Sequence, residues 1–147
     1  PDDEAVADAA VMADVDDNIR EFPNGYATVL GERGTTVSGG QKQRISIARA
    51  LMKDAPILIL DDAVSAVDTK TEKTILANLA ARRAGRTTLM IAHRISTVAD
   101  ADKIIYMEDG AVSAIGTHAE LYEVSAGYRR NVDLQKLEDE GEEHAHA

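Results

Sequence analysis

A run of four apolar residues, ILIL at 57–60, stands between a proline and the acidic pair Asp61 and Asp62. A short apolar run that ends in this way is typical of a strand buried on both faces of a parallel sheet. A second strand is predicted at TTLMIAH, residues 87–93, and the stretch between the two runs has helical spacing of its apolar residues. The order strand, helix, strand predicts an α/β fold.

Further elements are predicted on both sides of this unit. Thr69 and Glu72 form a predicted capping box ahead of the helix that joins the two strands. Asp2 and Asp3 can cap a first short helix. The remaining predicted elements are a loop over 22–36, an amphipathic helix after Gly40, a short helix over 95–101, a strand pair over 103–107 and 110–116, and a helix at the start of 134–147 that ends as a charged tail.

Composition excludes several classes of function. The chain has 147 residues and a formal net charge of -10, so its overall charge does not favour binding to nucleic acid. Cysteine is absent, which excludes disulfides and thiolate metal sites and fits a reducing compartment. Because no apolar run approaches the ~18 residues of a membrane helix, we expect the isolated chain to be soluble.

Three groups of residues are candidates for chemistry. Asp61 follows an apolar strand, where a carboxylate can hold a magnesium ion on a nucleotide, although an aspartate at this place can also merely cap the next turn. His93 ends the next predicted strand and could contact a terminal phosphate or an attacking water, or it could be a structural residue. The turn of Ser38, Gly39 and Gly40 opens a helix whose free amides suit an anion, although Ser38 could be only a helix cap.

A phosphate loop of the pattern G-x-x-x-x-G-K-[ST] is missing from the chain. The nearest approach is Gly34 to Gly39, where Gly40 takes the position of the lysine. That lysine reaches the β and γ phosphates of a bound nucleotide, so the chain lacks a phosphate-binding loop of its own.

Several motifs together resemble one family. VSGGQKQRISIARAL, residues 37–51, resembles the signature sequence of ABC-type ATPases, and ILILDDAVSAVD, residues 57–68, resembles their Walker B strand running into the D-loop. IAHRIST, residues 91–97, is similar to their switch-histidine segment, and TVLGERG, residues 28–34, resembles the stretch that precedes the signature in ABC exporters. The order and spacing of these motifs match, and the likeness runs from about Asp2 to Glu138.

The resemblance implies roles for individual residues. In ABC ATPases two nucleotide-binding domains meet head to tail, and the signature turn of one contacts the γ-phosphate of ATP bound by the other. Ser38, Gly39, Gly40 and Gln41 would therefore bind the ATP of a partner domain. By the same matching, Asp61 would hold Mg²⁺ through water, Asp68 would lie in the D-loop at the dimer interface, and His93 would contact the γ-phosphate of this chain's own nucleotide.

Two departures from the family refine this interpretation. The phosphate loop, the adenine-stacking aromatic and the Q-loop glutamine are missing, so the chain resembles the C-terminal part of an ABC-type (RecA-like) P-loop ATPase domain with part of its helical subdomain. On its own it is expected to bind ATP poorly or not at all.

The second departure is Asp62, which stands where catalytically competent members have the glutamate that orients the attacking water. Removing one methylene withdraws the carboxylate by roughly 1 Å, which can slow a reaction about a hundredfold. This pattern resembles the degenerate-site subunit of a heterodimeric ABC multidrug exporter.

The resemblance also predicts an organisation and partners. We expect a helical subdomain with the signature at 1–54, the C-terminal half of the ATPase core at 55–127, and a C-terminal helix with an acidic tail at 128–147. The expected partners are a second nucleotide-binding domain, from a different chain, and the transmembrane domain of an exporter through the segment around Glu32. No nucleic-acid partner is expected.

The chain would then act at the cytoplasmic face of the cell membrane, as part of a full-length transporter that hydrolyses ATP. Two alternatives remain open at this stage. One is a soluble ABC ATPase that works on DNA or the ribosome, which the acidic composition and the TVLGERG stretch disfavour. The other is a stand-alone signature module that regulates another ATPase. The missing phosphate loop supports this alternative as well as it supports a part of a larger ATPase domain.

Overall fold

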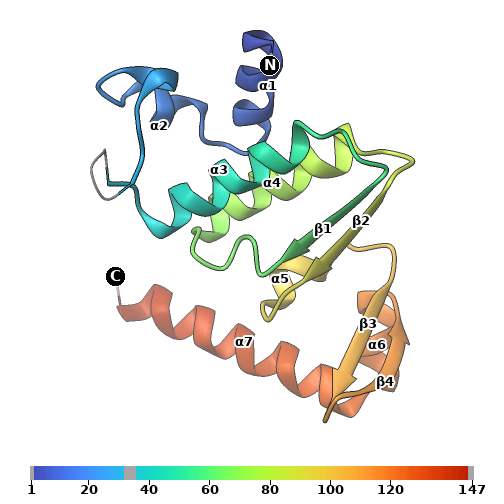
Figure 1. Ribbon diagram of the computed structural model, residues 1–147. Coiled ribbons are helices and arrows are strands. Elements are labelled where there is room, and N and C mark those ends of the chain that lie inside the picture. Colours follow the sequence, from blue (N-terminus) through green and yellow to red (C-terminus); the bar gives the residue numbers. More distant parts are fainter. Residues whose placement is uncertain (1, 32–35, 146–147) are drawn as a thin grey trace. The chain divides into compact units, whose positions relative to one another are not determined.

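The chain forms two compact units, Pro1–Ala92 and His93–Ala147. The computed structural model describes residues 2–31 and 36–145, with side chains described as far as residue 141. The predicted helical subdomain and the two predicted strands 57–60 and 87–93 fall mainly into the first unit (Figure 1). The division of the chain at 54/55 and 127/128 stays a prediction.

The first unit contains four α-helices, one short 3-10 helix and two strands among its described residues. The first helix begins where the sequence predicts, because the Asp2 carboxylate accepts a hydrogen bond of 3.2 Å from the amide of Glu4. The elements are α1 (Asp3–Met12), α2 (Asp16–Arg20), η1 (Gly25–Ala27), α3 (Gly39–Leu51), β1 (Ile57–Asp61), α4 (Thr69–Arg82) and β2 (Thr87–Ile91).

The cap of α4 differs by one residue from the predicted one. The side chain of Asp68, and not that of Thr69, accepts a hydrogen bond of 3.0 Å from the amide of Thr71. Asp68 has extended backbone angles and Thr69 is already helical. Aspartate and threonine are both good N-cap residues, and of these two neighbours Asp68 takes the N-cap position.

β1 and β2, which α4 connects along the chain, pair directly with each other in parallel, as expected for the predicted strand–helix–strand unit. The prediction that the ILIL strand is buried on both faces is wrong for the described chain. Leu58 and Leu60 are buried, whereas the Ile57 and Ile59 side chains are 60% and 61% exposed. Successive strand residues point to opposite faces, so one face of the sheet packs on helices while the other is open.

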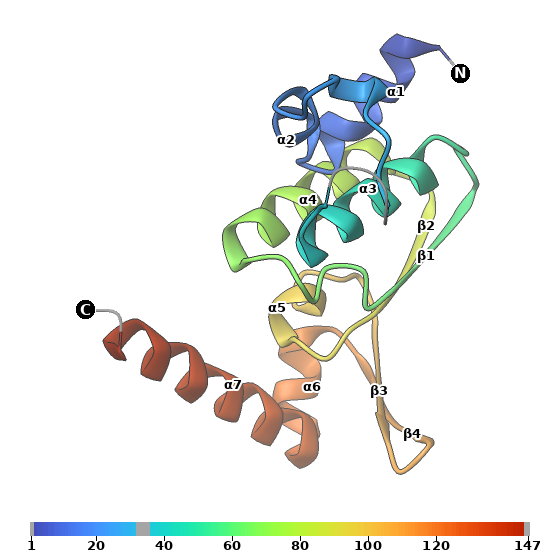
Figure 2. The same ribbon diagram turned by 60° about the vertical axis from the view of Figure 1, so that its left-hand side comes forward.

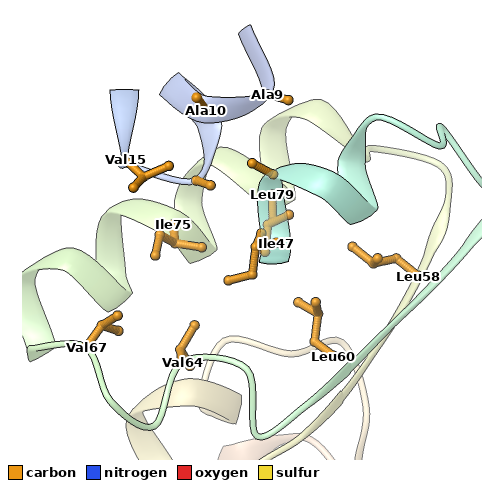
Figure 3. Close-up of a cluster of buried hydrophobic side chains, with 12 residues drawn as sticks. Ala9, Ala10, Val15, Ile47, Leu58, Leu60, Val64, Val67, Ile75 and Leu79 are labelled. Carbon is orange, nitrogen blue, oxygen red and sulfur yellow. The ribbon is translucent and has the colours of Figure 1, made fainter. Parts of the chain in front are cut away.

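One hydrophobic cluster holds the first unit together. It joins α1, α3 and α4 to the inner face of β1, with Ile47 and Ile75 among its fully buried side chains (Figure 3). In Figure 3 the side chains of Leu58, Leu60 and Ile47 point into the same space. The signature helix α3 is therefore fixed against the strand that ends in Asp61.

The second unit has a strand pair and three helices among its described residues. Strands β3 (Ile104–Glu108) and β4 (Ala111–Gly116) form an antiparallel hairpin, and both residues of its predicted turn, Asp109 and Gly110, have positive φ. The helices are α5 (Ile95–Val98), α6 (His118–Val124) and α7 (Ala126–Ala145). Leu121 of α6 and Tyr128 of α7 are buried in the core of this unit, together with Ile104 and Val132. The helix α6 packs beside α7 (Figure 2).

The C-terminal helix is longer than predicted. It begins at Ala126 and continues to Ala145, so the acidic segment that we expected to end as a tail is helical over most of its length. The helix α6, which precedes it, was not predicted, although Thr117 and Glu120 form a capping box at its start.

Candidate functional site: the signature turn and the carboxyl end of β1

The turn before α3 is closed by two reciprocal hydrogen bonds. The Ser38 hydroxyl accepts from the amide of Gln41 at 3.1 Å, and the Gln41 side-chain oxygen accepts from the amide of Ser38 at 3.0 Å. Ser38 is thus a helix cap, as one of the two interpretations of the sequence held. The cap does not compete with anion binding, because a hydroxyl that accepts a hydrogen bond can still donate one. The helix dipole and the free first-turn amides of Gly39 and Gly40 favour a negative charge at this point.

The glycines of the turn have a second, internal reason to be glycine. A Cβ atom at Gly40 would stand 2.7 Å from the carbonyl oxygen of Ala66 and 3.4 Å from the Val67 side chain. A Cβ atom at Gly39 would meet only the Cβ of Ala66, at an ordinary 3.6 Å. The signature turn therefore packs directly on the loop that follows β1, and only Gly40 must lack a side chain for that packing.

Asp61 and Asp62 stand at the carboxyl end of β1, and both are exposed. Asp61 is the last strand residue and pairs in register with Ile91. In the part of the chain that the structure describes, no hydrogen bond or ion pair engages the Asp61 carboxylate. No group of three or more His, Asp or Glu side chains among the described residues could enclose a metal ion. One or two carboxylates fit Mg²⁺ only where nucleotide phosphates and water complete its coordination.

Asp62 has an unusual backbone conformation. Its φ of 50° lies in the left-handed region, which apart from glycine mainly asparagine and aspartate adopt, and Asp14, Asp54 and Asp109 do so as well. Its amide donates a hydrogen bond of 2.8 Å to the carbonyl oxygen of Ile91 on β2. Its own carbonyl oxygen accepts from the Ser65 hydroxyl and from the Gln43 side chain, each at 3.1 Å. Strained backbone that is held by several bonds is common at functional sites.

Gln43 of α3 is a site residue that sequence reasoning missed. Its side-chain nitrogen donates to the Asp62 carbonyl and, at 2.9 Å, to the Ser65 hydroxyl, while its oxygen accepts from the amide of Ala66 at 2.8 Å. The signal in the sequence was its place four residues before Ile47, on the face of α3 that packs inward. A polar side chain on an inward face needs partners, and the loop after β1 supplies three.

Asp68, the predicted D-loop residue, is exposed at the start of α4. Hydrogen bonding to the backbone of Thr71, and then to its hydroxyl, holds the pKa of the Asp68 carboxyl below its ordinary value. The structure thus gives Asp68 a helix-capping role within the chain. Its role at a dimer interface stays a prediction.

His93 lies in the second unit, two residues after the end of β2, and its side chain is exposed. Its turn is held by Gln135 of α7, whose side-chain nitrogen donates to the carbonyl oxygen of His93 at 2.8 Å. The Gln135 oxygen accepts from the amide of Ile95 at 2.7 Å. The expected contact of His93 with the γ-phosphate of this chain's own nucleotide stays a prediction.

An apolar groove of about 400 Å³ lies between α1, η1 and α3. Tyr26 and Leu30 line it, and Val29 beside them is 74% exposed. Burial, and then a hydrogen bond of 2.5 Å to the Asp16 carboxylate, raise the pKa of Tyr26 to about 12.

Glu32, the predicted contact to a transmembrane domain, lies outside the described residues. Within residues 2–31 and 36–145, no helix is both long and apolar enough to cross a membrane.

Comparisons with known proteins agree on one family. The model of the family described as "ABC transporter" matches residues 2–65. The chain is 49% identical to "ABC transporter ATM1" of Toxoplasma gondii over 96% of its own length, and 48% identical to "ABC multidrug transporter MDR2" of Trichophyton interdigitale over 95%. It spans only 12% and 11% of the lengths of these two relatives.

A solved structure supports the same assignment of fold. The chain matches the "Structure of a bacterial Atm1-family ABC exporter with ATP bound" with a TM-score of 0.83 and 43% sequence identity. The match covers 90% of this chain and 23% of that one.

Proposed function

We propose, from the premise that the chain belongs to the ATP-binding domains of ABC transporters, that it is the C-terminal part of the ATP-hydrolysing motor of an exporter. One observation carries the proposal. The signature turn packs on the loop that follows β1, at Ala66, and the helix that the turn opens is hydrogen-bonded through Gln43 to the backbone of Asp62 at the acidic end of β1. Neither of the two readings set against it, a soluble ATPase or a stand-alone module, is favoured by a specific feature of the structure.

The signature turn would bind the ATP of a partner domain. Ser38, Gly39, Gly40 and Gln41 would face its γ-phosphate, supported by the free amides and the dipole at the start of a 13-residue helix. The absence of a phosphate loop within the 147 residues is consistent with an anion that is brought by another domain. By the same proposal, Asp68 would lie at the interface with that domain.

The chain's own nucleotide would face Asp61, Asp62 and His93. Asp61 would bind Mg²⁺ through water, and the ion would neutralise charge that develops on the phosphates. His93 would contact the γ-phosphate. Asp62 would orient the attacking water, and its carboxylate is shorter by one methylene than the glutamate of competent family members. We therefore propose that this site is slow and that the partner, a different chain, carries the fast one.

The membrane partner would dock close to the segment around Glu32. The exposed Val29 and the groove lined by Tyr26 and Leu30 offer an apolar surface immediately before that segment. We propose that an exporter's transmembrane domain contacts this surface, with the motor on the cytoplasmic side of the membrane.

The exchange Asp62→Glu in the full-length transporter tests the degenerate site. It would return the carboxylate to the reach of the attacking water, and we expect ATP turnover at this site to rise by roughly ten- to a hundredfold. The measurement is steady-state phosphate release with the partner chain present. Asp62→Asn is the matched control, because it keeps the length of the side chain and removes the base. An Asp62→Glu turnover no higher than that of the wild type would contradict the degenerate site.

A further inference from the structure

We propose that Gln43 is a positioning residue that couples the two nucleotide half-sites of this chain, an inference that rests on the proposed function above. One half-site is the turn Ser38–Gln41, which would serve the partner's nucleotide. The other is Asp62, which would serve the chain's own. Gln43 lies on the same helix as the first and is hydrogen-bonded to the backbone of the second.

The geometry of the Gln43 amide accounts for this role. The nitrogen donates to the Asp62 carbonyl oxygen at 3.1 Å and to the Ser65 hydroxyl at 2.9 Å. The oxygen accepts from the Ala66 amide at 2.8 Å. An uncharged amide supplies donors and an acceptor on one planar group, which neither glutamate nor lysine can do. Gln43 therefore fixes both ends of the short loop between Asp62 and Ala66.

The bonds act where the loop turns through a left-handed residue. Asp62 has a φ of 50°, and its carbonyl oxygen is oriented by Gln43 from α3 and by Ser65 from within the loop. Releasing the carbonyl lets the Asp62 backbone relax toward negative φ, which moves the carboxylate away from the end of β1. A displacement of about 1 Å at a reacting group can cost about a hundredfold in rate.

A second contact ties the same loop to the signature turn. Gly40 stands against the Ala66 carbonyl so closely that a Cβ atom would approach it to 2.7 Å. A shift of α3 on binding the partner's nucleotide would thus be transmitted to Ala66 by packing and to Asp62 through the Gln43 amide. Both routes lie within the first unit of the chain.

The test uses Gln43→Met and Gln43→Glu in the full-length transporter. Methionine keeps the length of the side chain and removes all three bonds, whereas glutamate keeps only the acceptor for the Ala66 amide. Ser46→Ala, an exposed position on the same helix, is the matched control. Each variant is made alone and together with Asp62→Glu, and turnover, thermal unfolding and hydrogen exchange of the segment 61–67 are measured.

We expect the gain from Asp62→Glu to fall at least tenfold in the Gln43→Met background and to be unchanged with Ser46→Ala. Exchange of the Ala66 amide is expected to be about fivefold faster in Gln43→Met and near the wild-type rate in Gln43→Glu, with the protection of amides elsewhere in the domain retained. Unchanged exchange at 61–67 in Gln43→Met, or loss of protection throughout the domain, would overturn the proposal.

The two proposals fail in different ways. If Asp62→Glu brings no gain even with Gln43 in place, the degenerate site is wrong, and Gln43 is then judged on the exchange of Asp62 and Ala66 alone. If Asp62→Glu brings the same gain with and without Gln43, the site stands and the coupling residue is wrong.

Discussion

At the scale of single residues, the signature glycines carry two constraints at once. By the proposed function, Gly39 and Gly40 would leave the backbone open to a phosphate. In the structure, Gly40 also lets the turn approach the Ala66 carbonyl. The first constraint follows from the family resemblance and applies to both residues. The second comes from the structure and applies to Gly40 alone, which makes the two glycines separable by experiment.

We predict that Gly40→Ala destabilises the domain in the absence of nucleotide and that Gly39→Ala does not. The added methyl at Gly40 must displace the backbone of Ala66, and backbone cannot move aside as a flexible side chain can. The expected cost is about 1 to 3 kcal/mol for Gly40→Ala, measured by chemical unfolding of the complete ATP-binding domain. Equal unfolding midpoints for the two variants would contradict the close packing.

Asp68 provides a prediction on pH. Its hydrogen bonds to Thr71 hold its folded pKa below the ordinary value of 3.8, so the ionised carboxylate favours the folded chain. This contribution is fully present above pH 3.8 and is lost as the pH falls through the folded pKa. We expect Asp68→Asn, which still caps α4 but does not titrate, to flatten the decline of the melting temperature below pH 4. An unaltered decline would show that another carboxylate is responsible.

At the scale of elements, a buried arginine holds the amino ends of the two strands. Arg83, at the end of α4, is 6% exposed, and its guanidinium donates to the Ala55 carbonyl at 3.1 Å and to the Thr87 carbonyl at 3.1 Å. It also donates to the Thr88 hydroxyl at 3.0 Å. Asp61 lies at the opposite end of β1. The hydrogen bonds of Arg83 therefore hold β1 and β2 in register at the end away from Asp61.

We predict that Arg83→Met lowers the free energy of unfolding by about 2 to 4 kcal/mol, because the Ala55 and Thr87 carbonyl groups lose the donor that the buried guanidinium supplies. Arg83→Lys is expected to recover only part of this, since an ammonium group lacks the planar fork of the guanidinium. Arg82→Met, at the exposed neighbouring position, is the control and is expected to unfold like the wild type. The measurement is urea unfolding, and an Arg83→Met midpoint equal to that of Arg82→Met would contradict this role of Arg83.

The helices and strands were predictable from the sequence where apolar residues recur at regular spacing. The strands 57–61 and 87–91, the helix after Gly40 and the hairpin turn at Asp109–Gly110 all lie where patterns of apolar residues and turn residues indicate. The hydrogen bonds of Gln43 and Gln135 were not predictable. Each joins residues far apart in the chain, and only tertiary packing decides which loop a helix side chain meets.

At the scale of the whole molecule, each unit exposes one apolar sheet face. In the first unit the face carries Ile57, Ile59, Leu89 and Ile91, each between 47% and 61% exposed. In the second it carries Ile105, Met107, Val112 and Ile115, each between 53% and 58% exposed. Burial on both faces was predicted for the first strand because an apolar run gives no sign of which residues will cover it.

We predict that the isolated 147-residue chain self-associates through the open face of β1 and β2. Its exposed isoleucine and leucine side chains and the unpaired edges of a two-stranded sheet favour association. The double exchange Ile59→Thr and Leu89→Thr keeps strand-forming residues and is expected to lower the apparent mass in light scattering. The matched exchange Leu58→Thr and Leu60→Thr, on the buried face, is expected to unfold the unit instead. A monomeric wild-type chain would contradict this prediction.

The central claim is that the signature turn of this chain acts on the nucleotide of its partner. It is tested most directly by photolabelling the full-length transporter carrying Ser38→Arg with a photoreactive ATP analogue, and then identifying which ATP-binding domain is labelled. A bulky cation at Ser38 would block the turn, so the account predicts that label is lost from the partner's phosphate loop and kept on this chain's own domain. Loss of label from this chain's own domain, with the partner still labelled, would contradict the account.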